Sequence, residues 1–198
     1  MNTRQHQLEG ACVAILLALT TLSAQAHSGI EAGWLHPLTG LDHFLAMVAV
    51  GAWSAQIGGR AIWLVPGAFV LCMLFGGLIG MSMIDLQGLE VGIALSVIAL
   101  GAAIALHQRM PIVVAALGVG LFGTLHGGYA HGYEMPIIDD KIGYTLGFLA
   151  TTATLHLIGA LGALGLMRIQ GGGKILRGLG LICSMCGGWI MFTAVGNL

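Results

Sequence analysis

The sequence predicts an all-α membrane protein, a bundle of six transmembrane helices that follows a cleaved signal peptide. Of the 198 residues, 57% are hydrophobic and only 8% are charged, and the mean hydropathy is +0.94. A chain of this composition cannot cover its surface with polar side chains, so its surroundings are lipid. The 33 glycines would destabilise water-exposed helices, but small residues let helices approach closely inside a bilayer.

The first 26 residues have the pattern of a signal peptide. Arg4 supplies a weakly positive start, residues 11–22 form an apolar segment, and Ala24-Gln25-Ala26 is a small-x-small cleavage site. The apolar segment is short for a membrane span of about 20 residues, which favours cleavage over an uncleaved anchor helix. We expect a mature chain that begins at His27 and forms one transmembrane domain over residues 27–198.

Apolar stretches of spanning length follow, separated by short polar or glycine-rich breaks. We predict transmembrane helices over residues 36–56, 61–83, 89–107, 111–130, 142–167 and 175–197. Lys and Arg favour the cytoplasmic side of a membrane. With the mature N-terminus outside, the cytoplasmic loops hold Arg60, Arg109, Arg168, Lys174 and Arg177, and only Lys141 lies outside. Both mature termini are then predicted on the outer side.

Glycines spaced four residues apart predict the faces on which these helices pack. The pairs are Gly76 and Gly80, Gly88 and Gly92, Gly123 and Gly127, and Gly143 and Gly147. The net charge of −1 and the absence of a basic run exclude nucleic acid as a partner. We expect the lipid bilayer as the main partner, and a homo-oligomer of the bundle is compatible with this composition.

The segment from His36 to His43 is the first candidate site. Burying a carboxylate in a membrane costs roughly 2.5–3.5 kcal/mol, so Asp42 needs a polar cavity or a cation such as a metal ion. Pro37 suits the first turn of a helix, which predicts His36 at the helix cap. On a regular helix His36 and His43 lie about 10 Å apart along the axis, too far to share one ion. We therefore expect successive sites, unless Pro37 or Gly40 bends the backbone.

A second candidate cluster lies at the outer end of the fourth predicted helix and contains His126, His131 and Glu134. On a regular helix His126 and His131 point about 140° apart, so sharing an ion requires a break at Gly127-Gly128. We expect the two glycines to break the helix there, and irregular backbone at this depth normally lines a cavity.

Two further histidines complete the candidate metal ligands. His156 falls near the middle of the fifth predicted helix, with Thr152 and Thr154 as candidates to hydrogen-bond its ring. A lone buried histidine is more often a core residue, but the other clusters favour a ligand. His27, if it becomes the first residue, can chelate a metal with its amine and imidazole, whereas an ordinary flexible terminus is the alternative. Imidazole with carboxylate suits nickel, zinc, copper or iron alike.

The order His-Pro-x-x-Gly-x-Asp-His, then Phe-Gly-x-x-His-Gly and a downstream histidine helix, resembles the HupE/UreJ family over nearly the whole mature chain. The resemblance implies a small secondary permease of the bacterial inner membrane, both termini periplasmic, that carries nickel or cobalt for hydrogenase or urease maturation. The ion is then a substrate, and no permanently bound cofactor is expected. The resemblance implies roles for His36, Asp42, His43 and His126, and we extend it to His131, Glu134 and His156.

Two other classes of function remain as alternatives. Histidines of facing helices can ligate haem in an electron-transfer subunit, although the candidates lie at unequal depths and beside carboxylates. Glu134 or Asp42 could serve as base in an intramembrane metal-dependent hydrolase, but the sequence has no His-Glu-x-x-His helix. We therefore expect a protein that is not an enzyme. The chain has no Gly-x-x-x-x-Gly-Lys-Ser/Thr segment, so it does not itself hydrolyse ATP to drive transport.

Overall fold

A computed structural model of the chain describes residues 29–80, 88–129 and 139–196, and every regular element in these ranges is a helix. The helices are α2 (Gly29–Thr39), α3 (Leu41–Ile57), α4 (Ala61–Gly80), α5 (Leu89–Ala105), α6 (Ile112–Tyr129), α7 (Lys141–Met167) and α8 (Gly172–Gly196). The predicted all-α class is confirmed. The predicted signal peptide lies outside the described residues.

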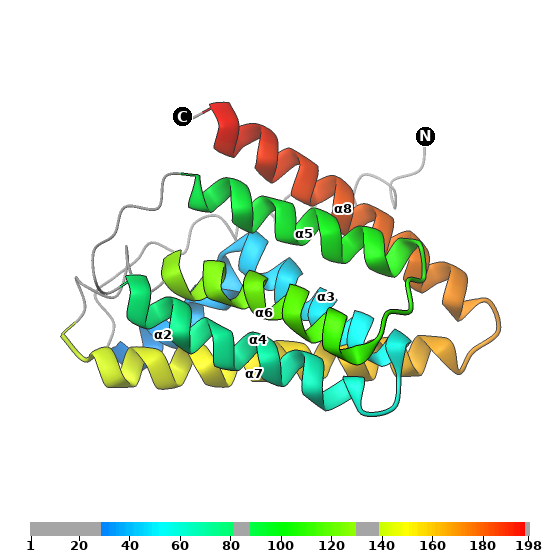
Figure 1. Cartoon of the computed structure of the whole chain (residues 1–198), viewed down its shortest axis with the longest axis horizontal. Helices are drawn as coiled ribbons and strands as arrows, with labels where there is room; N and C mark the ends of the chain where they lie inside the picture. Colours follow the sequence, from blue (N-terminus) through cyan, green and yellow to red (C-terminus); the bar gives the residue numbers. More distant parts are fainter. Residues whose placement is uncertain (1–28, 81–87, 130–138, 197–198) are drawn as a thin grey trace, which may run out of the picture.

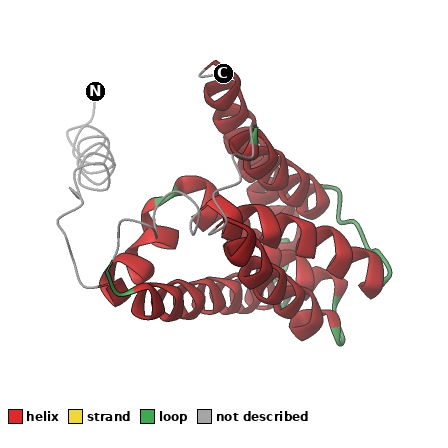
Figure 2. Cartoon of the chain, turned by 60° about the vertical axis from the view of Figure 1, so that its left-hand side comes forward, coloured by secondary structure: helices red, strands yellow, loops and turns green. Residues whose placement is uncertain are grey.

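The helices form one bundle in which each packs mainly on a particular partner. α4 packs on α6, α5 packs on α8, and α7 lies along both α2 and α3. In Figure 1, α5 and α8 form one layer, and α7 runs along the opposite edge beneath α4. Figure 2 shows the same helices from another side, with short loops between several of them. α3 also contacts α4 and α5, so it occupies the centre of the bundle.

The single first helix predicted over residues 36–56 is wrong, because the chain breaks there into α2 and α3. The two helices meet at Gly40 with a bend of 76°. Gly40 has φ −76° and ψ 108°, an extended conformation that ends the helical ladder and places Gly40 at the N-cap of α3. Pro37 lies inside α2, close to its C-terminal end, rather than in a first turn. The bend that we kept as the alternative is therefore what the structure contains.

The predicted break at Gly127-Gly128 is also wrong, since α6 continues without interruption to Tyr129. Gly127 instead serves packing: a Cβ there would overlap the backbone carbonyl of Met73 on α4. Gly76 and Gly123 allow the same close approach between α4 and α6. Two of the predicted packing glycines serve helix ends instead. Gly88 adopts a left-handed conformation with φ 82° at the N-cap of α5, and a Cβ on Gly143 would meet the side chain of Asp140, the N-cap of its own helix.

Glycines produce equally close contacts in the rest of the bundle. A Cβ on Gly51 of α3 would overlap the backbone carbonyl of His156, so α3 and α7 are in backbone contact at this point. A Cβ on Gly101 would meet the backbone of α8, where Gly180 returns the same contact to α5. These backbone contacts explain how a chain so rich in glycine forms a tightly packed bundle, as its composition predicts.

The described helices support a multi-pass membrane protein. α4, α7 and α8 are each long and apolar enough to cross a membrane, and α2 with α3 passes the same test as one bent pair. α5 and residues 112–127 of α6 are apolar but shorter. Large apolar side chains such as Trp63 and Phe192 are each 72% exposed, whereas several histidines are buried. This distribution suits lipid, which favours apolar side chains outside and polar ones in the bundle interior.

Candidate metal-binding site

The break at Gly40 brings together two histidines that a regular helix would separate. The ring centroids of His36 on α2 and His43 on α3 lie 4.5 Å apart, with the rings edge to face. The separation of about 10 Å that a regular helix would give these two residues is therefore wrong, and the bend that was the stated exception brings their rings together. His36 also lies 5.4 Å from the ring of Phe148 on α7, which closes one side of the pair.

Asp42 fixes the orientation of His43. One carboxylate oxygen, Oδ1, accepts a hydrogen bond of 2.8 Å from the backbone N–H of His43 and lies 3.0 Å from its ring atom Nδ1. An ionised carboxylate only accepts, so Nδ1 of a neutral His43 carries the proton and donates it to Asp42. The lone pair of His43 then resides on Nε2. Carboxylates hold metal-binding histidines in this way in many proteins.

His126 on α6 joins the pair from the opposite side. Its ring centroid lies 4.6 Å from that of His43, again edge to face, and the side chain is fully buried. Its Nε2 lies 3.0 Å from the hydroxyl oxygen of Ser96 on α5. The hydroxyl of Ser96 donates its hydrogen to the carbonyl of Ile93 at 2.6 Å.

A hydroxyl has one hydrogen, so Ser96 must accept from His126 rather than donate to it. The proton of neutral His126 therefore sits on Nε2, and Nδ1 holds the lone pair. Nδ1 is buried and has no hydrogen-bond partner among the residues that the structure describes. Ser96 thus acts on His126 as Asp42 acts on His43, because each determines which ring nitrogen keeps its lone pair.

Three imidazoles from three helices therefore lie in a row, His36, His43 and His126, with Asp42 beside the central ring. Within residues 29–80, 88–129 and 139–196, no three His, Cys, Asp or Glu side chains are grouped so as to hold a metal ion. The edge-to-face rings do not converge on one point as they stand. Holding one ion between neighbours requires the rings to turn about their side-chain bonds.

His156 on α7 lies apart from this row. Phe69 on α4 separates them, with its ring centroid 5.6 Å from that of His126 and 5.1 Å from that of His156. Both ring nitrogens of His156 are buried and have no hydrogen-bond partner in the described part of the chain. The expected hydrogen bonds from Thr152 and Thr154 are wrong, because these hydroxyls donate to Met47 and to the Ala150 carbonyl.

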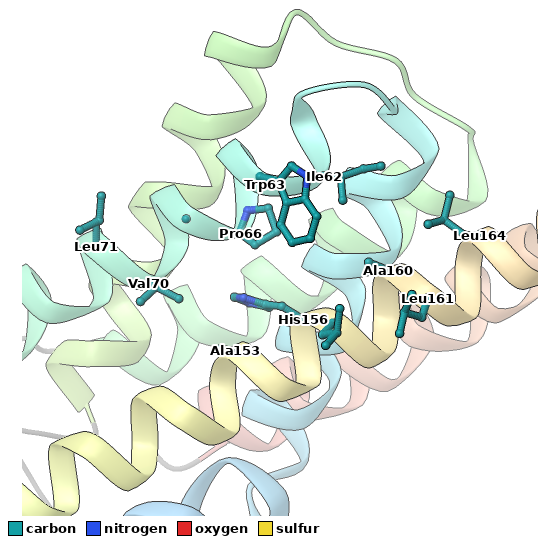
Figure 3. A pocket seen from close by; sticks show the side chains of 12 residues that line it. Ile62, Trp63, Pro66, Val70, Leu71, Ala153, His156, Ala160, Leu161 and Leu164 are labelled. Atoms are coloured by element: carbon teal, nitrogen blue, oxygen red, sulfur yellow. The ribbon is translucent and has the colours of Figure 1, made fainter.

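A cavity of about 530 Å³ between α4 and α7 has His156 in its wall. The other lining side chains are apolar, among them Trp63, Pro66 and Leu161. In Figure 3 the imidazole of His156 extends from α7 toward α4 and is surrounded by these side chains. His156 is thus a buried imidazole in apolar surroundings, which suits a weak site better than a strong one.

Three predicted ligands, His27, His131 and Glu134, lie outside the described residues, and their roles stay predictions. Two residues of the site were missed from the sequence. Ser96 is a polar residue inside an apolar helix and is fully buried, a pattern that could have marked it. Phe69 carried no such signal, because an aromatic residue in an apolar helix is ordinary.

Comparison with known proteins gives two matches and one negative result. The model of the family described as HupE / UreJ protein matches residues 12–190. Protein HupE of Rhizobium leguminosarum bv. viciae is 42% identical over 179 residues, which cover 84% of this chain and 93% of that protein. No solved structure matches the chain.

Proposed function

This chain belongs to the HupE/UreJ family, a family of transporters rather than enzymes, and we propose that it is a secondary permease that takes up nickel. Cobalt is the second substrate of the proposal, because imidazole and carboxylate ligands do not separate these two ions. The proposed setting is the inner membrane, crossed by six helices, with both mature termini in the periplasm. The proposed destination of the metal is a hydrogenase or a urease under maturation.

The observation that carries the proposal is the row of three imidazoles with Asp42 beside it. A dication that leaves water needs lone-pair donors in place of its hydration shell. Asp42 sets the tautomer of His43 so that its Nε2 can supply a lone pair. Ser96 does the same for Nδ1 of His126. Asp42 also supplies a negative charge, which lowers the cost of placing a dication in the bundle.

The arrangement favours passage over storage. Neighbouring imidazoles from different helices let an ion bind one ring before it leaves another, so that no single step requires a bare ion. His156, beyond Phe69, is the proposed next site along this path. Weak sites in sequence permit both entrance and exit of the ion. Because the chain has no P-loop segment, the proposed driving force is the ion gradient, the membrane potential or proton coupling.

The test is uptake of radioactive nickel by proteoliposomes that contain the purified protein. We expect uptake by the wild type, and none above empty liposomes with His43→Ala or Asp42→Asn, with cobalt as a strong competitor. His107→Asn is the matched control, because His107 is exposed in a loop and has φ 53°, a conformation that asparagine tolerates. This variant should transport like the wild type.

Two outcomes would overturn the proposal. Wild-type protein that binds nickel but does not exceed empty liposomes would be a sensor or a metal-containing subunit instead. Protein that is purified with a visible absorption band would favour the haem-binding alternative.

A further inference from the structure

Two methionine sulfurs and one threonine hydroxyl meet in the centre of the bundle, away from the histidine row. The hydroxyl of Thr152 on α7 donates to Sδ of Met47 on α3 at 3.3 Å and lies 3.9 Å from Sδ of Met73 on α4. All three side chains are completely buried. One hydroxyl oxygen and two thioether sulfurs, from three helices, therefore come together in the core.

The hydrogen bond of Thr152 differs from those of the other threonines on α7 in its acceptor. Thr145 and Thr154 donate to backbone carbonyls four residues earlier, at 2.9 Å and 2.7 Å, the usual arrangement for a hydroxyl inside a helix. Thr151 donates at 3.1 Å to the backbone carbonyl of Trp34 on α2. Thr152 instead donates across the helix interface to sulfur, which is a weak acceptor. The local backbone thus does not account for where this hydroxyl points.

The position of the cluster follows from helix register. Met47 comes four residues after His43 on α3, and Thr152 comes four residues before His156 on α7. The contacts of Met47 with Thr152 and of Gly51 with His156 show that α3 and α7 run in the same direction. One turn of helix is about 5.4 Å. The cluster therefore lies about one turn beyond the histidine row and about one turn before His156.

The separations suit donors to a single ion. Sulfur and oxygen ligands bind transition metals at about 2.3 Å and 2.1 Å, so two of them on one ion lie roughly 3–3.6 Å apart. The distance of 3.3 Å from Thr152 to Sδ of Met47 lies within this range, and the distance of 3.9 Å to Sδ of Met73 lies slightly above it. Thioethers are neutral and need not lose a proton, and they prefer soft ions to Mg²⁺ or Ca²⁺.

We propose that Met47, Met73 and Thr152 form an intermediate binding site for the transported metal ion, between the histidine row and His156. This inference rests on the proposed permease function. Neutral sulfur and hydroxyl ligands hold a dication loosely, so the ion passes on to His156 rather than remaining there. The same ligands bind hard cations poorly, which makes the cluster a second selection step after the imidazoles.

The test compares the double variant Met47→Leu/Met73→Leu with the wild type. Leucine and methionine have similar volumes and exchange with little loss of stability in cores, so folding should survive. We expect nickel uptake into proteoliposomes to fall by about tenfold or more, as when groups around a metal site are removed. Nickel binding to detergent-solubilised protein, measured by equilibrium dialysis, should stay close to the wild-type value, because the histidine row is intact.

Met185→Leu is the control, because Met185 is 67% exposed on α8 and should tolerate the change without loss of uptake. Thr152→Val and Thr152→Ser provide a second comparison: the valine variant should lose uptake, and the serine variant, which keeps the hydroxyl, should retain it. Uptake by the double leucine variant equal to that of Met185→Leu would overturn the intermediate site. A wild type without uptake would instead refute the permease function itself, so the two failures are distinguishable.

Discussion

Replacing Ser96 with alanine tests the reasoning about His126 most directly. Ser96→Ala removes the oxygen that accepts the Nε2 proton of His126 at 3.0 Å. A fully buried donor left without a partner costs about 1–3 kcal/mol. Without this bond His126 loses its preference for the tautomer whose Nδ1 can bind a metal. A metal bound at Nδ1 would withdraw charge from the imidazole and strengthen the hydrogen bond from Nε2 to Ser96. Loss of this hydrogen bond therefore destabilises the metal-bound protein more than the metal-free protein.

We expect Ser96→Ala to lower nickel affinity by about tenfold, within the 10–100-fold range for groups that orient metal ligands. The assay is isothermal titration of the detergent-solubilised protein with nickel, together with its thermal unfolding. Ser54→Ala is a matched control. Ser54 is equally buried, and its hydroxyl donates to the carbonyl of Gly51 at 2.7 Å, as that of Ser96 does to Ile93. Ser54, however, has no hydrogen bond to a histidine among the described residues.

Ser96→Ala should therefore lose about 1–3 kcal/mol more stability than Ser54→Ala, because it alone leaves the buried Nε2–H of His126 without an acceptor. Only Ser96→Ala should lose nickel affinity. Equal nickel affinities in the two variants would refute the assignment of the His126 tautomer. A loss of stability confined to Ser96→Ala, with unchanged affinity, would show that Ser96 supports folding alone.

Three further predictions follow from single features of the bundle. Gly51→Ala should strongly lower the thermal stability of the protein, because the new Cβ would overlap the backbone carbonyl of His156. Gly162→Ala on α7 is the control and should be neutral or stabilising in the same thermal unfolding, because no described atom lies within 4 Å of the new Cβ. Gly40→Ala should weaken nickel binding in titrations of folded protein. The new Cβ would lie 3.1 Å from the carboxylate oxygen Oδ1 of Asp42 and push this carboxylate away from His43. Wild-type nickel affinity in this variant would show that Asp42 and His43 can shift together. Nickel uptake should fall reversibly as the pH is lowered to about 5, because protons compete with the metal for imidazole nitrogens; uptake that is unchanged at this pH would contradict imidazole coordination.

The sequence predicted the parts of the site that depend on residue type, and it missed the parts that depend on backbone direction. Asp42 and His43 stood out because a carboxylate beside a histidine in an apolar segment demands a reason. Pro37 misled the assignment of the helix, since proline is compatible with a first turn and also with the last turn before a break. The bend at Gly40 therefore could not be chosen over a regular helix from composition alone.

Contacts between distant segments were equally out of reach. The hydrogen bond between Ser96 and His126 joins residues 30 positions apart, and that between Thr152 and Met47 joins residues 105 positions apart. Local periodicity carries no information about such pairs. Gly127 shows the opposite error: in water a glycine pair suggests a break, but in a bilayer the same residue allows α6 to approach α4.

The glycine contacts divide the described helices into three interlocked groups, α4 with α6, α5 with α8, and α7 with α2 and α3. Close-packed backbones resist sliding, so each group would move as a rigid body. His43 belongs to one body, His126 to the second and Ser96 to the third. The boundaries between the three bodies would thus cross the proposed ion path. A small rotation at these boundaries would separate the imidazoles without unwinding a helix. In the proposed permease, release of the ion and the change of access from one side of the membrane to the other would then be one motion.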